Sequence, residues 1–233
     1  LGYNSNLYRP SDYDSQASVS GDLTLNYRVK NGNLIRGYVG GFKETTQGQE
    51  WRPNDGWVGW VNNAFWYRSN KLVLGQQVRF SMPLSRESRD RDTKLTGVSL
   101  VPVAIATLSP SVTLIYQPQL IRNFHTYKQN RAGSNNTEYA LNHTFVASIS
   151  LSDRFYFQPV VVYGDSWTYG GTRKDPIYQV AGELGYGINN QFTVAAGWSN
   201  GGAFRRFEQG SDQTLEVFNN NTSSVYTALY WVF

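Results

Sequence analysis

Cysteine is absent from the 233-residue sequence, and charged residues are scarce. Without cysteine the chain can form neither a disulfide-stapled secreted scaffold nor a cysteine-ligated metal site. Charged residues make up 16% of the chain, whereas a soluble domain usually contains about 25%. Apolar residues make up only 40%, so the composition is not hydrophobic as a whole. This combination favours a surface on which residues facing lipid alternate with residues facing water.

The sequence also lacks a helical membrane span and a recognisable signal peptide. Its longest mostly apolar run, VSLVPVAIATL at 98–108, is interrupted by Pro102 and is shorter than the roughly 20 residues that a transmembrane helix needs. No segment repeats apolar residues at the spacing of an amphipathic helix. The first residues, LGYNSNLYRP, contain neither a basic nor an apolar stretch, so we expect the sequence to be that of the mature protein.

Apolar residues instead recur at every second position through most of the chain. In GDLTLNYRV (21–29), Leu23, Leu25 and Tyr27 fall on one face, and polar residues lie between them. The same alternation marks the segments 71–82, 111–126, 137–151, 154–164, 177–188 and 191–199. A period of two indicates β-strands with one apolar and one polar face, and about ten residues cross a bilayer as a tilted strand. We therefore predict an all-β protein whose strands cross a membrane.

Short and long connections alternate between the predicted strands. The short turns are at 30–33, 69–71, 108–110, 152–153 and 189–190. The long polar connections are at 43–56, 85–94, 127–137, 165–175 and near 200–222. Short turns at one end of a barrel and long loops at the other are typical of outer-membrane β-barrels.

The strand count follows from this alternation. From residue 17 onward the pattern indicates eleven crossings, and an additional outward strand within 1–9 gives the even number that bacterial barrels require. An alternative pairs TLEVFN (214–219) with the last strand. The prediction is a transmembrane antiparallel up-and-down β-barrel of about twelve strands, which forms a single domain over 1–233.

The last segment, SSVYTALYWVF (223–233), carries a family resemblance. Leu229, Trp231 and Phe233 fall on one of its faces. An apolar edge strand of this kind would promote aggregation, whereas a closed barrel pairs its last strand with its first. A C-terminal phenylalanine that follows alternating apolar and aromatic residues resembles the assembly signal of bacterial outer-membrane β-barrel proteins. The resemblance implies a location in the Gram-negative outer membrane and recognition by its insertion machinery.

Aromatic residues bracket several predicted strands, as in the interfacial girdles of membrane barrels. The segment 57–67 has such residues at both of its ends, beginning with Trp57. Phe155 and Phe157 bracket a second strand together with Tyr163.

The motifs of enzymatic barrels are not present. A barrel of the phospholipase type would carry a His-x-Ser pair. Here Thr144 and Phe145 follow His143, so the serine is absent. His143 also falls on the apolar face. His125 is not part of such a pair either, and Asp90 and Asp92 have no histidine near them in sequence. We expect no enzymatic activity, no metal site, no cofactor and no nucleic-acid binding.

The polar face of the strands is the remaining candidate site. By alternation the residues that face the barrel interior include Asn26, and the candidate pore-lining residues are Asp22, Arg28, Gln77, Arg79, Gln117, Gln119, Asn123, His125, Glu138, Asn142, Gln158, Gln179 and Glu183. Buried charges must be paired or solvated. Two arrangements satisfy this rule: the side chains line a water-filled path, or Arg28 and Arg79 pair with Glu138 and Glu183 and plug the barrel.

Two functions follow from these two arrangements. The first is a narrow passive channel for small or amphipathic solutes, because Ile115, Ile121, Val146, Val160 and Val162 also fall on the interior face. No run of inward arginines resembles a ladder for acidic sugars, which argues against an oligosaccharide porin. The alternative is a structural or surface-recognition barrel with a closed lumen, whose external loops bind lipopolysaccharide or another cell surface. The expected partners are outer-membrane lipid, lipopolysaccharide and the insertion machinery, and the expected state is a monomer.

Overall fold

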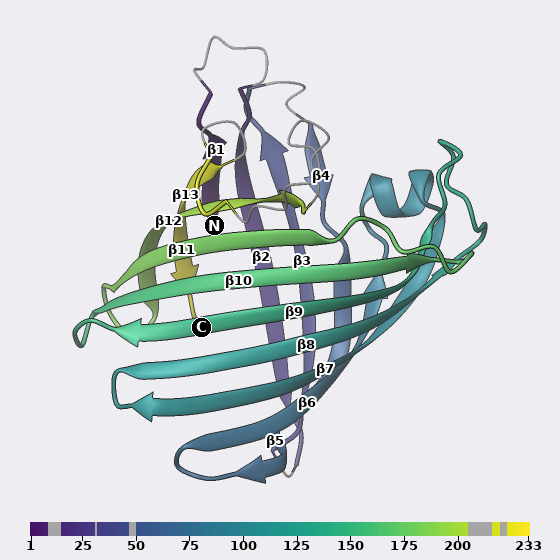
Figure 1. Cartoon of the computed structure of the whole chain (residues 1–233). Coiled ribbons are helices and arrows are strands. Elements are labelled where there is room, and N and C mark those ends of the chain that lie inside the picture. The colour runs from purple at the N-terminus through teal and green to yellow at the C-terminus, as the bar shows by residue number, and fades with distance from the viewer. Residues whose placement is uncertain (9–14, 31, 47–49, 205–215, 220–222) are drawn as a thin grey trace.

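The computed structural model describes residues 1–8, 15–30, 32–46, 50–204, 216–219 and 223–233. In these residues the chain forms strands and one short helical turn (Figure 1). The strands are β1 (Gly2–Asn6), β2 (Ala17–Arg28), β3 (Leu34–Glu44), β4 (Trp51–Pro53), β5 (Gly56–Arg68), β6 (Leu72–Met82), β7 (Lys94–Ser109), β8 (Val112–His125), β9 (Thr137–Ser150), β10 (Phe155–Thr168), β11 (Ile177–Gly187), β12 (Phe192–Ala203) and β13 (Ser224–Trp231). The helical turn is η1 (Glu87–Arg91). Among the described residues, no helix has the length and apolar character that a membrane span would require.

The first strand closes the sheet into a barrel. β1 pairs antiparallel with β2 on one side and with β13 on the other. Of the thirteen strands in the sheet, β4 pairs only with β3, so the other twelve form the ring. The prediction of an all-β antiparallel up-and-down barrel with about twelve strands is confirmed. Closure pairs every edge, which is the condition for a sheet to lie in lipid.

The first and last strands also decide between the two predicted strand counts. The strand expected within 1–9 is β1, and it completes the even number. The alternative strand at 214–219 lies partly outside the described residues, and 216–219, which are described, contain no strand. The last strand therefore pairs with β12 and β1.

Short turns and long connections lie at opposite ends of the barrel, as predicted. The short turns at the lower left of Figure 1 join β5 to β6, β7 to β8, β9 to β10 and β11 to β12, while η1 and the loop between β8 and β9 lie at the upper right. The turn between β2 and β3 shows why short connections suffice. Gly32 adopts a φ of +73° there, in the left-handed region that glycine occupies without steric penalty.

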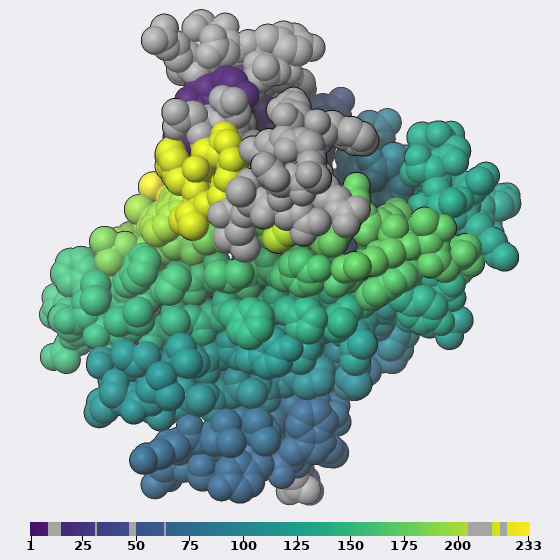
Figure 2. Space-filling model, in the orientation of Figure 1, coloured from purple at the N-terminus to yellow at the C-terminus, as the bar shows by residue number. Residues whose placement is uncertain are grey.

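Alternate residues of every strand face outward. Gly37 pairs with Leu25 and with Val58, and Val58 also pairs with Phe80. In this row Leu25 is 55% exposed and Phe80 is 51% exposed. The outward side chains of β7 to β11 pack into a continuous surface (teal to green in Figure 2). The apolar face of the strands is thus the outer surface of the cylinder, and the other face lines its lumen.

Candidate functional site in the barrel lumen

Strand pairing places most of the predicted pore-lining residues on the inner face. The row that begins at Asn26 continues through Arg36, Gly59 and Arg79 to Ser99, and it lies opposite the apolar row described above. The predicted residues that share this face are Asp22, Arg28, Gln77, Arg79, Gln117, Gln119, Asn123, His125, Asn142, Gln158, Gln179 and Glu183. The face that alternation assigns to these residues is therefore the face on which they lie in the closed ring.

Glu138 is the exception, because the strand is irregular at its position. The register between β9 and β10 shifts between Trp167 and Thr168. The Glu138 carboxylate lies 3.4 Å from the guanidinium of Arg122, and Arg122 in turn lies over the ring of the outward residue Tyr139. A bulge changes the face to which the next residue points, so alternation does not place Glu138 in the lumen.

The ion pairs of a plugged barrel are not formed among the described residues. Glu138 pairs with Arg122, and Glu183 accepts hydrogen bonds from tyrosines rather than arginines. Arg79 donates to Gln77 Oε1 from Nε at 3.1 Å and from a terminal nitrogen at 2.6 Å. The pairing of Arg28 and Arg79 with the two glutamates, one of the two arrangements left open by the sequence, is therefore not found among the described residues.

One side of the lumen is basic. Arg36 on β3 and Arg79 on β6 lie on either side of Gly59 in β5, which pairs with both. A Cβ on Gly59 would approach Val78 O to 2.4 Å, so a side chain there would displace the neighbouring strand. Arg36 Nε donates to Asn26 Oδ1 at 2.6 Å. We refer to Arg36 and Arg79 together as the basic wall.

The basic wall is held by neutral partners. The guanidinium of Arg79 lies 4.3 Å from the centre of the Trp57 ring, an arrangement that stabilises the cation through the ring quadrupole. Trp57 in turn stacks on Tyr38 at 6.2 Å. Because amides and aromatic rings carry no charge, both arginines keep their positive charge on the inner face.

The other side of the lumen is built around one glutamate. Glu183 on β11 is only 8% exposed. Its Oε1 accepts a hydrogen bond from the hydroxyl of Tyr156 at 2.7 Å. Its Oε2 accepts from Tyr226 at 3.1 Å and from Tyr230 at 2.7 Å. We refer to Glu183 and these three tyrosines as the acidic wall.

Glycines make room for the rings of the acidic wall. A Cβ on Gly185 would lie 2.1 Å from the ring of Tyr156, and one on Gly197 would lie 2.5 Å from the ring of Tyr226. β11 lies six strands from β5 in either direction around the ring, so the two walls belong to opposite sides of the barrel.

A cavity of about 390 Å³ adjoins the acidic wall. Its lining includes Tyr226, Tyr230 and Gln179, and it reaches Asp22 on β2. Asp22 Oδ1 accepts a hydrogen bond from Tyr38 at 2.6 Å. Neutral donors thus hold this second inner carboxylate as well.

The inner face is closely packed elsewhere. Val61 on β5 is 0% exposed, and Val101 and Val103 on β7 are 2% and 3% exposed. Val61 and Val101 both pair with the inner residue Gln77, and Val103 lies two residues further along β7 on the same face. Side chains therefore fill part of the lumen.

Several residues of the site were not predicted from the sequence. Arg36 and Tyr38 were missed, and Tyr156 was overlooked between the phenylalanines taken as a girdle. Trp57 was assigned to a girdle, but it stacks against the inner residues Arg79 and Tyr38. Asn26 pairs with Arg36 across the β2–β3 hairpin. Because alternation assigns Asn26 to the inner face, this pairing could have placed Arg36 there as well.

The predicted assembly residues and His143 lie on the outer face. Leu229 is 38% exposed, Trp231 is 59% exposed and Phe233 is 75% exposed. Trp231 stacks on Phe192 with ring centres 6.0 Å apart. His143 Nδ1 lies 2.8 Å from the hydroxyl of Tyr116, which shares the same outward row.

Comparisons with known proteins agree with the fold. No family model and no curated protein sequence matches the chain. Among solved structures, the NanC porin has a TM-score of 0.62 at 11% sequence identity, and the match covers 100% of this chain and 97% of NanC. OmpT, an outer membrane protein of Vibrio cholerae, has a TM-score of 0.47 at 9% identity over 100% of this chain and 95% of that chain. The likeness to NanC shows that the two chains share the fold of a closed antiparallel β-barrel.

Proposed function

We propose that this chain is a narrow passive channel in a Gram-negative outer membrane, open to small or amphipathic solutes. The observation that carries the proposal is the way in which the inner charges are held. Amides, aromatic rings and phenols hold Arg36, Arg79 and Glu183 in place without neutralising them. Charges of this kind need water or a polar solute in the lumen, because a dry interior would require them to pair.

The outer surface supports a location in lipid. Apolar side chains such as Tyr27, Leu120 and Phe145 are 71%, 50% and 51% exposed. A continuous apolar surface of this extent is rare on a soluble monomer, and it matches the lipid-facing band of a membrane barrel. We place the protein in the outer membrane as a monomer surrounded by lipid and lipopolysaccharide.

The lumen supports a preference for small solutes with both polar and apolar parts. Gln117 and Gln119 of β8 alternate along the strand with outward residues, and the inner residues Ile115 and Ile121 lie in line with them. A solute in the lumen therefore meets amides and apolar side chains on the same strand.

Single-channel recording in planar bilayers tests the channel. We expect discrete conductance steps, and we expect Arg79→Gln to raise the permeability of cations relative to anions and Glu183→Gln to lower it. Arg122→Gln is the matched control, because Arg122 faces outward and should leave the ion preference unchanged. A bilayer that stays silent at high protein load would refute the channel, and an equal effect of all three variants would refute the role of the two walls.

The proposal extends to assembly. We propose that Leu229, Trp231 and Phe233 present the outward apolar pattern that the insertion machinery recognises. Phe233→Ala should lower the amount of folded barrel in the membrane, as measured by heat-modifiable mobility on gels. Phe155→Ala, which removes another outward ring, 45% exposed, from β10, is the control. Equal loss in both variants would show only a general need for aromatic residues.

A further inference from the structure

The external end of the barrel carries a group of interlocked loops. The connection that contains η1 and the loop at 126–136 are far apart in sequence, but two backbone hydrogen bonds join them. Arg131 N donates to Arg91 O, and Thr126 N donates to Thr93 O, each at 2.9 Å. The two loops therefore form one unit above the ends of β7, β8 and β9.

A buried asparagine fixes the join between these loops. Asn136 is 3% exposed, and its Nδ2 donates to Asp92 O at 2.8 Å and to Tyr127 O at 2.9 Å. Asn130 Nδ2 also lies 3.4 Å from Asp92 Oδ1. Asn130 and Asn136 of the loop at 126–136 thus fasten it to Asp92 of the η1 connection.

These loops enclose a cavity of about 220 Å³ that is lined by basic side chains. Its charged and titratable lining residues are Arg91, Asp92, Lys94, His125 and Lys174, and amide and hydroxyl groups supply most of the rest. Three cations and one carboxylate leave a net charge of +2 when His125 is neutral. The structure thus brings His125 and Asp92 to one cavity, although they are distant in sequence.

The basic residues of the cavity differ in their partners. Arg91 Nε lies 2.9 Å from Asp92 Oδ1. Lys94 Nζ is 3.7 Å from Asp55 Oδ2, and Asp55 is not part of the cavity lining. Lys174 forms no ion pair within the described part of the chain. Its charge is therefore available to a bound anion.

The backbone is strained at the edge of the cavity. Thr93, between Asp92 and Lys94, has a φ of +54°, which is unfavourable for a β-branched residue. Its hydroxyl is buried and has no hydrogen-bond partner among the described residues. Strain of this kind persists where the surroundings impose it and often marks functional sites. At this position the strained residue lies between Asp92 and Lys94, which both line the cavity.

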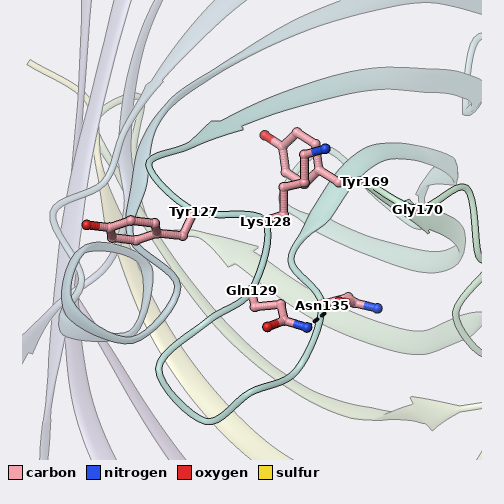
Figure 3. Close-up of a pocket in the computed structure, with 6 residues that line it drawn as sticks. All are labelled: Tyr127, Lys128, Gln129, Asn135, Tyr169 and Gly170. Carbon is pink, nitrogen blue, oxygen red and sulfur yellow. Dashed lines mark hydrogen bonds between the residues drawn. The ribbon is translucent and has the colours of Figure 1, made fainter.

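A second hollow adjoins the cavity and widens the surface that a ligand can contact. It measures about 430 Å³, is lined by Tyr127, Lys128, Gln129, Asn135, Tyr169 and Gly170, and shares Asn135 with the cavity. Gln129 and Asn135 join the two arms of the loop through a hydrogen bond of 3.4 Å (Figure 3). Its aromatic and amide side chains and the ammonium of Lys128 suit a polar body.

We propose that the cavity binds the phosphate group of a phosphate ester whose polar body occupies the adjoining hollow. Lysine ammonium groups bind phosphate as point charges. The cavity holds the volume of about seven water molecules at about 30 Å³ each, so it accepts one tetrahedral anion with a partial water shell. Both a phosphorylated lipopolysaccharide headgroup and a free sugar phosphate have this chemistry.

Titration of the full chain with inorganic phosphate tests the site. The protein is purified in detergent at fixed ionic strength, and binding is measured by calorimetry with chloride as the background anion. We expect saturable binding that Lys174→Gln weakens about ten-fold, the loss expected for one charge-assisted hydrogen bond. Lys94→Gln should weaken it similarly. Lys71→Gln is the matched control, because Lys71 lies in the short turn between β5 and β6, at the other end of the barrel, and should leave the Kd unchanged.

The outcomes separate this site from the channel and identify the ligand's source. Binding is measured without a membrane, so a silent bilayer does not affect the result. If Lys94→Gln does not fold, the result with Lys174→Gln alone tests the site. Absence of saturable phosphate binding, or an equal loss in Lys71→Gln, would overturn the site. Competition by lipopolysaccharide that is lost on dephosphorylation assigns the headgroup, competition by a soluble sugar phosphate assigns the solute, and competition by neither overturns the phosphate-ester proposal.

Discussion

The two inner walls of the barrel hold their charges in different ways. On the basic wall, one amide oxygen binds each of Arg36 and Arg79, although a guanidinium has five N–H donors. On the acidic wall, three phenol hydroxyls converge on the two oxygens of Glu183. The carboxylate is therefore close to saturation, whereas the described residues leave much of the hydrogen-bonding capacity of the arginines for water or solute.

This difference separates a structural role from a functional one. Tyr156, Glu183 and Tyr230 connect β10, β11 and β13 along one side of the lumen, so they help to fix the strands next to the closing pair β1–β13. The basic wall also contacts neighbouring strands, through Asn26 and Trp57, but each of its arginines has one hydrogen-bonding side-chain partner among the described residues and so presents more of its charge. We therefore expect changes in the acidic wall to affect mainly stability, and changes in the basic wall to affect mainly ion preference.

Removal of the Glu183 carboxylate should have the largest effect on stability. Glu183→Ala leaves three phenol hydroxyls without their acceptor, and each buried unsatisfied group costs about 1–3 kcal/mol. We expect the free energy of unfolding, measured with urea in lipid vesicles, to fall by about 3 kcal/mol. Glu138→Ala, which breaks only the ion pair with Arg122, should lower it by less than about 1 kcal/mol. Similar losses in the two variants would contradict the structural role of the acidic wall.

A methyl group on Gly185 should disturb the same wall by steric contact. Its Cβ would lie 2.1 Å from the Tyr156 ring, so the ring must move and its hydroxyl must leave Glu183. We expect Gly185→Ala to lower the free energy of unfolding by about 2 kcal/mol, in the range of overpacked cores. Gly187→Ala is the control in the same strand, since its Cβ would approach no atom closer than 3.7 Å. Equal stability of both variants would show that Tyr156 can move without loss.

The strands and most of the inner face were predictable because alternation depends on the sequence alone. In a two-faced strand, successive residues point to opposite sides wherever the strand lies in the barrel. Gln77 and Arg79 on β6, and Gln179 and Glu183 on β11, are separated by even spacings within apolar alternation. Their inner placement needed no knowledge of their neighbours.

The walls themselves were not predictable, because they depend on register and on local irregularity. Residues around Arg36 are glycine or apolar on both faces of β3, so alternation does not distinguish the two sides. Tyr156 of β10 approaches Tyr226 and Tyr230 of β13 only through the pairing of four successive strands, β10 to β13. Glu138 lies where the register shifts, and a bulge has no reliable signature in a single sequence.

Replacement of Arg79 by lysine should distinguish charge from stacking on the basic wall. Lysine keeps the charge but loses the planar contact with Trp57, whose ring centre lies 4.3 Å from the guanidinium. We expect Arg79→Lys to retain the ion preference of the channel and to lower the free energy of unfolding by about 1 kcal/mol. Arg79→Gln should change the preference with a similar stability loss. If Arg79→Lys changed the preference as strongly as Arg79→Gln, the geometry of the guanidinium rather than its charge would set the preference.

The smallest effect concerns Asp55, a carboxylate of the external loops that is also held by neutral donors. It accepts hydrogen bonds from Ser85 N at 3.0 Å and Ser88 Oγ at 2.5 Å, while Lys94 Nζ is 3.7 Å away. Burial by itself would raise the pKa of Asp55, but the hydrogen bonds from Ser88 and Ser85 and the charge of Lys94 bring it below its ordinary value.

The sign of the pH dependence follows from this lowered pKa. The contribution of Asp55 is complete above the unfolded pKa of about 3.9 and disappears as the pH falls through the lower folded value. Amide hydrogen exchange of η1, corrected for its intrinsic pH dependence, should show the loss of protection, with an effect below about 1 kcal/mol. The Asp55→Asn variant lacks the titrating group. Its comparison with the unmodified chain therefore distinguishes the effect of Asp55 from effects of Glu87, Asp90 and Asp92. If neutral donors stabilise Asp55 as they do Glu183, Ser88→Ala will raise the pKa of Asp55 more than Lys94→Gln does. A larger effect of Lys94→Gln would show that stabilisation by neutral donors is confined to the lumen.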